Sequence, residues 1–205
     1  MDLLPLTAHE LLTTTRGVRL RLDLDRDVPR EVLLECVRDA LQAPSGSNAW
    51  PMQFVLVTDR GQIDRLADIY RAVYEELYKG SAGYIGALDK GSAERNASQQ
   101  RTARSADHLA ENFHRVPAVA IACGAGDPGS IMPGMWSFML AARLRGLGTA
   151  WTALHLVRAA ETAEVLGLPQ EVRIAAIAPV AYSLGTDFKP ALRPEPEEVV
   201  HWDRW

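Results

Sequence analysis

The chain has 205 residues, of which 47% are hydrophobic and 23% are charged, and its formal net charge is −4. This composition is typical of one soluble globular domain with a sizeable core. A net negative charge gives no overall attraction to nucleic acid or to an anionic membrane, so we expect neither as a partner.

The start of the chain and the cysteines predict a cytoplasmic protein. Residues 1–15 carry two acids and no long apolar run, which argues against a secretory signal. The most apolar segment, residues 132–144, is interrupted by Pro133 and is too short to cross a bilayer. Cys36 and Cys123 lie far apart in the sequence, which favours free thiols and leaves a disulfide open.

The first half of the chain predicts three helices and one buried strand. A short helix over residues 6–14 precedes a basic turn. The second helix opens near Pro29 and ends before Pro44. An apolar strand follows at residues 54–57, and an amphipathic helix begins at Asp59.

The second half predicts further helices and strands in alternation. Residues 79–98 are rich in Gly, Ala and Ser and predict a mobile excursion over the domain. Beyond it, helices are expected at residues 99–114, 133–144 and 158–166, and strands at residues 118–123, 149–156 and 173–184. Helices outnumber strands, and a mixed sheet with helices on its faces fits this pattern best.

The end of the chain differs from the rest in composition. Residues 189–205 contain three prolines and finish with Trp202 and Trp205. Two exposed tryptophans at a free end would leave a large apolar surface in water. We therefore expect a domain over residues 1–188 and a C-terminal extension that packs on a neighbouring subunit.

The basic turn, residues 16–21, contains three arginines. One interpretation is a solvated surface, since three aspartates follow within residues 23–27. The other is an anion site, in which Gly17 permits close backbone approach while Arg16 and Arg19 offer planar guanidinium groups to a phosphate. The residue pattern leaves both interpretations open.

A polar loop joins the second helix to the first strand. It consists of Pro44, Ser45, Gly46, Ser47 and Asn48. Two hydroxyls, an amide and a bare backbone suit one side of a polar, planar ligand. Ordinary turn chemistry also accounts for these residue types.

Two later segments carry further candidates. Residues 145–154 predict a helix stop followed by a strand, or a place where backbone N–H groups face a flat ring. Arg193, which precedes Pro194, is either a surface residue or a second anion contact.

The sequence lacks the motifs of several common kinds of catalytic and cofactor-binding site. Glu111 and His114 have the i, i+3 spacing of metal ligands, but no second pair accompanies them, so a surface role is favoured and no metal is expected. His155 has no GxSxG nucleophile motif beside it, and the chain contains neither a GxGxxG fingerprint nor a Walker loop.

In their order along the chain, these features resemble the FMN-dependent nitroreductase family over nearly the full length. The matching segments are residues 14–19, the PSGSN loop at residues 44–48, residues 140–149, residues 166–169 and residues 189–205. The resemblance implies an α+β fold, with a mixed sheet flanked by helices. It also implies an intertwined homodimer with exchanged C-terminal tails and two FMN sites in the subunit interface.

The resemblance also assigns the cofactor-binding residues. Arg16, Gly17 and Arg19 match the family's basic motif at the phosphate, ribityl chain and pyrimidine edge, and Arg193 matches a late phosphate contact. Pro44, Ser45, Gly46, Ser47 and Asn48 match the loop that approaches from the other subunit. Thr152, Ala153 and Leu154 fall where backbone amides lie near flavin N5.

Three positions depart from the family pattern. The family usually has Gln before the proline that follows the loop and Trp after it, whereas this chain has Trp50 and Met52. Thr15 stands where many relatives have the first of two arginines.

The activity implied by the resemblance is FMN-dependent, ping-pong transfer of reducing equivalents from NADH or NADPH to a small acceptor such as a nitro compound or a quinone. Flavin N5 carries the chemistry, so no catalytic side chain is expected. Two alternatives remain. One is an FMN enzyme of oxidase or dehalogenase type that does not use NAD(P)H, and the other is a non-catalytic flavin-binding module.

Overall fold

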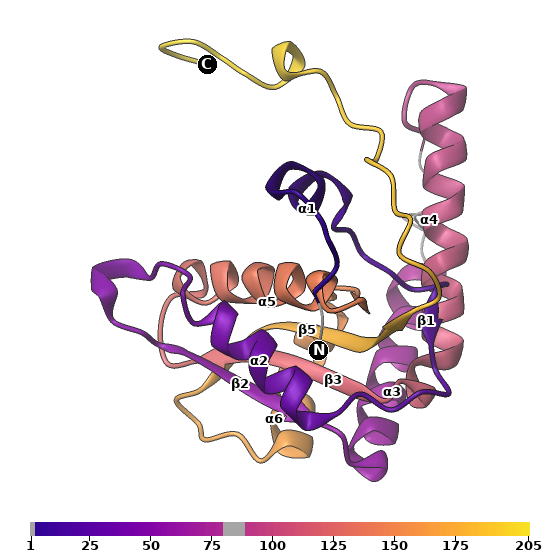
Figure 1. The fold of residues 1–205 in the computed structure, drawn as a ribbon. Helices are drawn as coiled ribbons and strands as arrows, with labels where there is room; N and C mark the ends of the chain where they lie inside the picture. The colour runs from indigo at the N-terminus through magenta and orange to yellow at the C-terminus, as the bar shows by residue number, and fades with distance from the viewer. Residues whose placement is uncertain (1–2, 80–88) are drawn as a thin grey trace.

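The computed structural model describes residues 3–79 and 89–205 and places helices on both faces of a central sheet (Figure 1). The helices are α1 (Ala8–Thr14), α2 (Arg30–Ala40), α3 (Arg60–Tyr74), α4 (Ala93–Asn112), α5 (Met132–Leu144) and α6 (Ala159–Leu166). The strands are β1 (Leu22–Asp23), β2 (Met52–Val57), β3 (Ala118–Gly124), β4 (Leu147–Thr149) and β5 (Arg173–Ser183).

The five strands form one sheet in the order β1-β5-β3-β2, and β4 also pairs with β5. All of these pairings are antiparallel, and an isolated parallel bridge joins Gly17 to Thr149. This architecture confirms the expected α+β class with a sheet flanked by helices.

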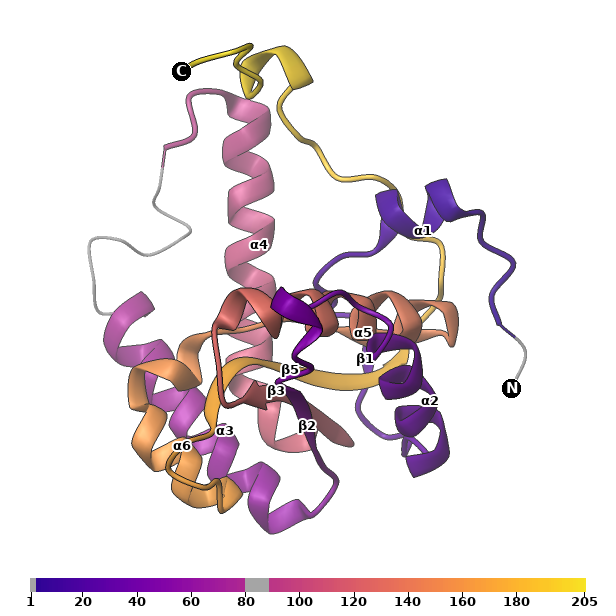
Figure 2. The same cartoon turned by 90° about the vertical axis from the view of Figure 1, so that its left-hand side faces the viewer.

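The central strands divide the core into two halves (Figure 2). Side chains alternate along a strand, so successive residues face opposite helical layers. Val119 and Ile121 pack with α3 and α4 on one face. Ala120 and Ala178 pack with α2 and α5 on the other. Because β3 is covered on both faces, its sequence is a continuous apolar run.

Three helix ends follow local signals in the sequence. Asp59 caps α3 by accepting a hydrogen bond of 2.9 Å from the Gln62 N–H. Thr7 forms a capping box with Glu10 at the start of α1. Gly167 ends α6 with a φ of 64°, a left-handed conformation that glycine adopts without steric cost.

The strand expected over residues 149–156 is wrong. β4 ends at Thr149, and Leu154–Arg158 forms a 3₁₀-helix. Continuing the register of β4 on β5 would pair Ala150 with Pro179, which has no N–H to donate. Pairing therefore stops and resumes only as a single bridge at Thr152.

The excursion expected over residues 79–98 is wrong at its C-terminal end. Helix α4 begins at Ala93, where the Ser92 hydroxyl accepts a hydrogen bond of 3.2 Å from the Arg95 N–H. The helix expected from residue 99 therefore starts earlier. Residues 80–88 lie outside the described residues, so the rest of that prediction is untested.

From Lys189 the chain leaves the body of the protein and runs past the N-terminal end of α4 (Figures 1 and 2). An ion pair of 3.3 Å between Arg95 and Glu198 joins this extension to the helix. Beyond it, Trp202 is 84% exposed and Trp205 is fully exposed. Packing of the extension on a neighbouring subunit remains a prediction.

The remaining expectations concern the thiols and membrane spans. Cys36 and Cys123 are both free and buried, as predicted. Burial raises the pKa of the Cys36 thiol to about 12, so it stays protonated. Within residues 3–79 and 89–205, no helix combines the length and apolar character needed to cross a bilayer.

Candidate functional site

An open cavity of about 1040 Å³ lies between the basic turn, α4, α5 and the start of the C-terminal extension. Among the described residues, five arginines line it and no aspartate or glutamate does. These arginines are Arg16, Arg19, Arg21, Arg101 and Arg193. Guanidinium groups in a lining without carboxylates create a positive potential, so the cavity is suited to an anionic ligand.

The five guanidinium groups differ in their partners. Arg16 donates to the carbonyl of Lys189 at 3.0 Å, and Arg193 donates to the carbonyl of its neighbour Leu192 at 3.2 Å. Arg21 pairs with the Asp187 carboxylate at 2.5 Å. Arg19 and Arg101 make no hydrogen bond or ion pair with any described residue. Their donors are therefore available to a ligand.

The core holds the basic turn in place. The Val18 N–H donates to the Thr149 carbonyl at 2.7 Å, and the Val18 side chain is buried. Its neighbours Gly17 and Arg19 consequently line the cavity. A Cβ at Gly17 would lie 3.5 Å from Arg19 Nη1, which is an ordinary contact. Glycine here leaves backbone exposed to the cavity without being required by any clash.

The segment after β4 presents a free backbone amide. Thr152 exchanges two hydrogen bonds with Ile177, of 2.8 and 3.3 Å. The Leu154 N–H donates to Thr152 Oγ1 at 3.3 Å. The N–H of Ala153 donates to no acceptor among the described residues, and Ala153 lines the cavity. Of the three residues whose backbone amides are expected near flavin N5, only Ala153 has an N–H without an acceptor among the described residues.

A smaller cavity of about 390 Å³ adjoins the first and shares Arg19 and Trp151 with it. Tyr70, Tyr74 and Tyr78 line its wall at helical spacing. The rings of successive tyrosines are stacked, with centroid separations of 6.3 and 5.6 Å. Burial raises the pKa of Tyr70, so its phenol is neutral at physiological pH. This cavity offers aromatic surface next to the cationic one.

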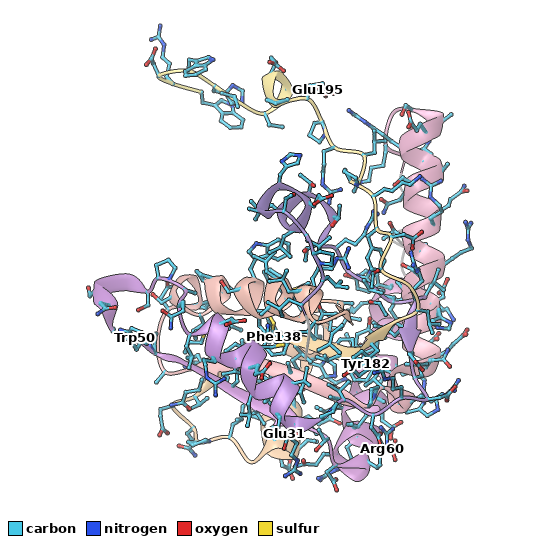
Figure 3. The ribbon with its side chains drawn as sticks, in the orientation of Figure 1. Glu31, Trp50, Arg60, Phe138, Tyr182 and Glu195 are labelled. Carbon is cyan, nitrogen blue, oxygen red and sulfur yellow. The ribbon has the colours of Figure 1, made fainter. Side chains whose placement is uncertain are left out.

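The polar loop lies elsewhere. None of its residues, Pro44 to Asn48, lines either cavity. Figure 3 places Trp50, which follows the loop, at the end of the molecule opposite α4. The Gly46 N–H donates to Ser130 Oγ at 3.0 Å, and the Trp50 N–H donates to Ser45 Oγ at 3.1 Å. Within one protomer, the loop is therefore remote from the arginines.

The sequence-predicted site residues thus fall into two separate groups. The large cavity brings together Arg16, Gly17, Arg19, Thr152, Ala153 and Arg193. Leu154 lines the adjoining cavity. The five loop residues form the second group, and their approach to a second copy of the cavity remains a prediction.

Sequence reasoning missed several lining residues. One of them is Arg101 on α4. Ser98 and Ser105 lie three and four residues from it, and together with Thr102 they line the same cavity. That spacing marks one polar face of a helix. Three aromatic residues were missed as well, since nothing local connects them: Trp136, Trp151 and Phe188.

Two other candidates have structural or surface roles. His155 is fully buried, and its Nε2 lies 2.9 Å from the Leu66 carbonyl. Burial lowers the pKa of His155 to about 4, so it is neutral at physiological pH. Glu111 and His114 are both exposed, and no described group of three or more His, Cys, Asp or Glu side chains is arranged to hold a metal.

Solved structures share the fold along nearly the whole chain. Iodotyrosine deiodinase bound to FMN and 3-iodo-L-tyrosine superposes with a TM-score of 0.73 at 20% identity, covering 97% of this chain and 100% of that one. The FMN and NADPH-dependent nitroreductase NfnB from Sphigopyxis sp. strain HMH gives 0.71 at 21%, covering 98% and 100%. A BluB-like flavoprotein from Clostridium difficile 630 gives 0.71 at 17%, covering 97% and 100%.

Comparison by sequence gives a family rather than a single relative. No curated protein matches the chain. The model of the nitroreductase family matches residues 12–182, which include the basic turn, the polar loop and all of the sheet except the last residue of β5. The chain therefore belongs to the nitroreductase family.

Proposed function

We propose that the chain binds FMN in the arginine-lined cavity and is an FMN-dependent oxidoreductase. The observation that supports this most directly is that the described residues lining a cavity of about 1040 Å³ include five arginines and no acid. The phosphate of FMN is an anion, and its ring is planar with polar edges. Guanidinium groups, a free amide and two tryptophans in the lining fit these features.

The residues divide the work of binding. Arg19 and Arg101, which have no partner among the described residues, would hold and neutralise anionic parts of FMN. Arg16 and Arg193 each use one guanidinium nitrogen on a nearby carbonyl and keep the others for the ligand. The free Ala153 N–H would donate to an acceptor on the ring edge. When bound, FMN supplies the redox chemistry.

The protein contributes electrostatics that exist before any reaction. Fixed guanidinium groups stabilise negative charge on a bound group without reorganising when that charge develops. No side chain in the cavity needs to act as a general acid or base. We propose NADH or NADPH as electron donor, supported by the NADPH-dependent nitroreductase among the similar structures, and a small nitro compound or quinone as acceptor.

A second copy of the chain completes the proposed site. The polar loop, residues 44–48, is remote from the cavity of its own protomer, and it would approach that of a partner. Residues 189–205 would then pack on the partner as an extension of the domain formed by residues 1–188. The two free cysteines support a cytoplasmic location.

A second candidate keeps FMN and changes the reaction. The similar structures include a deiodinase and a BluB-like flavoprotein besides the nitroreductase, at comparable TM-scores. The alternative that this observation favours is an FMN enzyme that does not depend on NAD(P)H. A non-catalytic flavin-binding module is the third possibility.

Absorption spectroscopy tests the proposal. We expect the purified protein to bind FMN, and we expect anaerobic addition of NADH or NADPH to bleach the flavin band. Bound FMN that neither nicotinamide bleaches would support an FMN enzyme that does not use NAD(P)H. If such a protein also turned over no acceptor, the result would support a non-catalytic flavin-binding module. Failure of the wild-type protein to bind FMN would overturn the proposal.

A matched pair of variants on α4 tests the cavity itself. Arg101→Ala removes a guanidinium that has no partner among the described residues, so we expect FMN affinity to fall about tenfold. Arg104→Ala removes an exposed arginine that lies outside the cavity lining, so affinity should stay unchanged. Equal affinities for both variants would contradict the assignment of this cavity.

A further inference from the structure

The polar loop contains a hydrogen bond that fixes one of its side chains. The indole Nε1 of Trp50 donates to Asn48 Oδ1 at 2.7 Å. An indole N–H only donates, so the atom of the Asn48 carboxamide that faces it must be the oxygen. The amino group of Asn48 then points to the other side. It has no acceptor among the described residues.

The backbone around this bond is held in an uncommon conformation. Ser47, Asn48 and Trp50 have φ angles of 53°, 52° and 53°, in the left-handed region. Asparagine adopts this region more readily than most residues, whereas a bulky tryptophan does so rarely. The surrounding fold must therefore impose it, through the hydrogen bonds that Ser45 and Ser130 accept.

Core packing does not explain Trp50. Its side chain is more than half exposed, at 56%, and it stacks on no other ring among the described residues. Trp50 is exposed, its backbone is strained, and its one polar side-chain atom is directed at the Asn48 amide. This geometry is suited to holding that amide in one orientation. The position is also one of the departures from the family pattern, which usually has Gln there.

We propose that Trp50 is a positioning residue, which orients the Asn48 carboxamide so that its amino group is presented as a hydrogen-bond donor to bound FMN. The inference rests on the proposed function, in which the loop approaches the FMN of a second copy. Without the indole N–H, the carboxamide is free to rotate and present its oxygen instead, which repels an acceptor atom of the ligand.

A double-mutant cycle tests the coupling of the two residues. Trp50→Phe keeps an aromatic ring and the same backbone restriction but removes the N–H. We expect its dissociation constant for FMN, measured by fluorescence quenching, to rise about fivefold. Asn48→Ala should raise it about tenfold, and adding Trp50→Phe to that variant should have no further effect. The visible circular dichroism of bound FMN should change in both single variants.

Asn48→Asp provides an independent test that preserves the loop. Aspartate tolerates the left-handed region and still accepts from the indole, but it has no donor to offer. We expect weaker FMN binding at an unchanged melting temperature of the apoprotein. Wild-type affinity in Asn48→Asp or Trp50→Phe, or additive losses in the cycle, would overturn the inference and leave the proposed function standing. Absence of FMN binding by the wild type would overturn both.

Discussion

His155 lies in the core beside the rings of Tyr70 and Phe113, with centroid separations of 5.5 Å to each. Its Nε2 faces the Leu66 carbonyl, so this nitrogen carries the proton of the neutral ring. Nδ1 is buried and has no hydrogen-bond partner among the described residues. A second proton at Nδ1 would create a charge among apolar groups, which explains the lowered pKa.

The buried histidine predicts acid sensitivity. The pKa of His155 is about 4 when folded, below its ordinary value of 6.5, so between these pH values the unfolded chain binds the extra proton. The stabilisation is fully present above pH 6.5 and is lost as the pH falls toward 4. We expect this group alone to lower the free energy of unfolding by ~3 kcal/mol at pH 4.

Urea denaturation as a function of pH measures this effect. His155→Gln keeps a side-chain donor for the Leu66 carbonyl but does not titrate. The wild type should lose more stability than this variant between pH 6.5 and 4. Identical pH profiles for the two proteins would show that His155 does not contribute.

The end of a strand can depend on a contact between residues that are far apart in the sequence. Strand β3 ends at Gly124, which pairs with Met52, the first residue of the neighbouring strand β2. A Cβ at Gly124 would overlap the carbonyl oxygen of Pro51. The close approach of these two backbones therefore depends on the missing side chain.

A single methyl group at this junction should destabilise the sheet. We expect Gly124→Ala to lower the free energy of unfolding by about 1–3 kcal/mol, because the Pro51 backbone must move. Gly61→Ala is the control, since a Cβ in the first turn of α3 would lie 3.4 Å from Asp59 Oδ1, an ordinary contact. Thermal denaturation compares the two, and an unchanged melting temperature for Gly124→Ala would contradict the overlap.

At the scale of the whole molecule, the exposed apolar residues of the C-terminal extension need an explanation. Val199 and Val200 are 60% and 46% exposed, and the tryptophans beyond them are almost uncovered. A segment of this composition is stable in water when it packs on another surface. The separation of the polar loop from the cavity also points to assembly.

The extension predicts a change in mass in solution. We expect sedimentation to give the wild-type protein a mass of about twice the 22.5 kDa of one chain. A variant truncated after Glu198 should dissociate into monomers at protein concentrations where the wild type is still a dimer. Arg204→Ala is the control, because it removes a charge and leaves both tryptophans in place. An FMN-bound wild type that sediments as a monomer would contradict both the dimer and the shared site.

Much of the local structure could be predicted from the sequence. The capping signal at Asp59 and the glycine stop at Gly167 are local, so the start of α3 and the end of α6 followed from a few neighbouring residues. The continuous apolar run of β3 likewise predicted a strand buried on both faces. The basic turn suggested an anion site for the same reason, because three arginines lie within six residues.

Other features depended on the tertiary structure. Pro179 interrupts the pairing of β4 only because the register of β5 would place it opposite Ala150. Arg101 belongs to the site because α4 packs beside the basic turn. The sequence by itself determined most of the helices, the long buried strands and the family motifs, because periodicity and turn chemistry act over a few residues. Strand register and the lining of the cavity were decided by the fold, because they arise from contacts between distant segments.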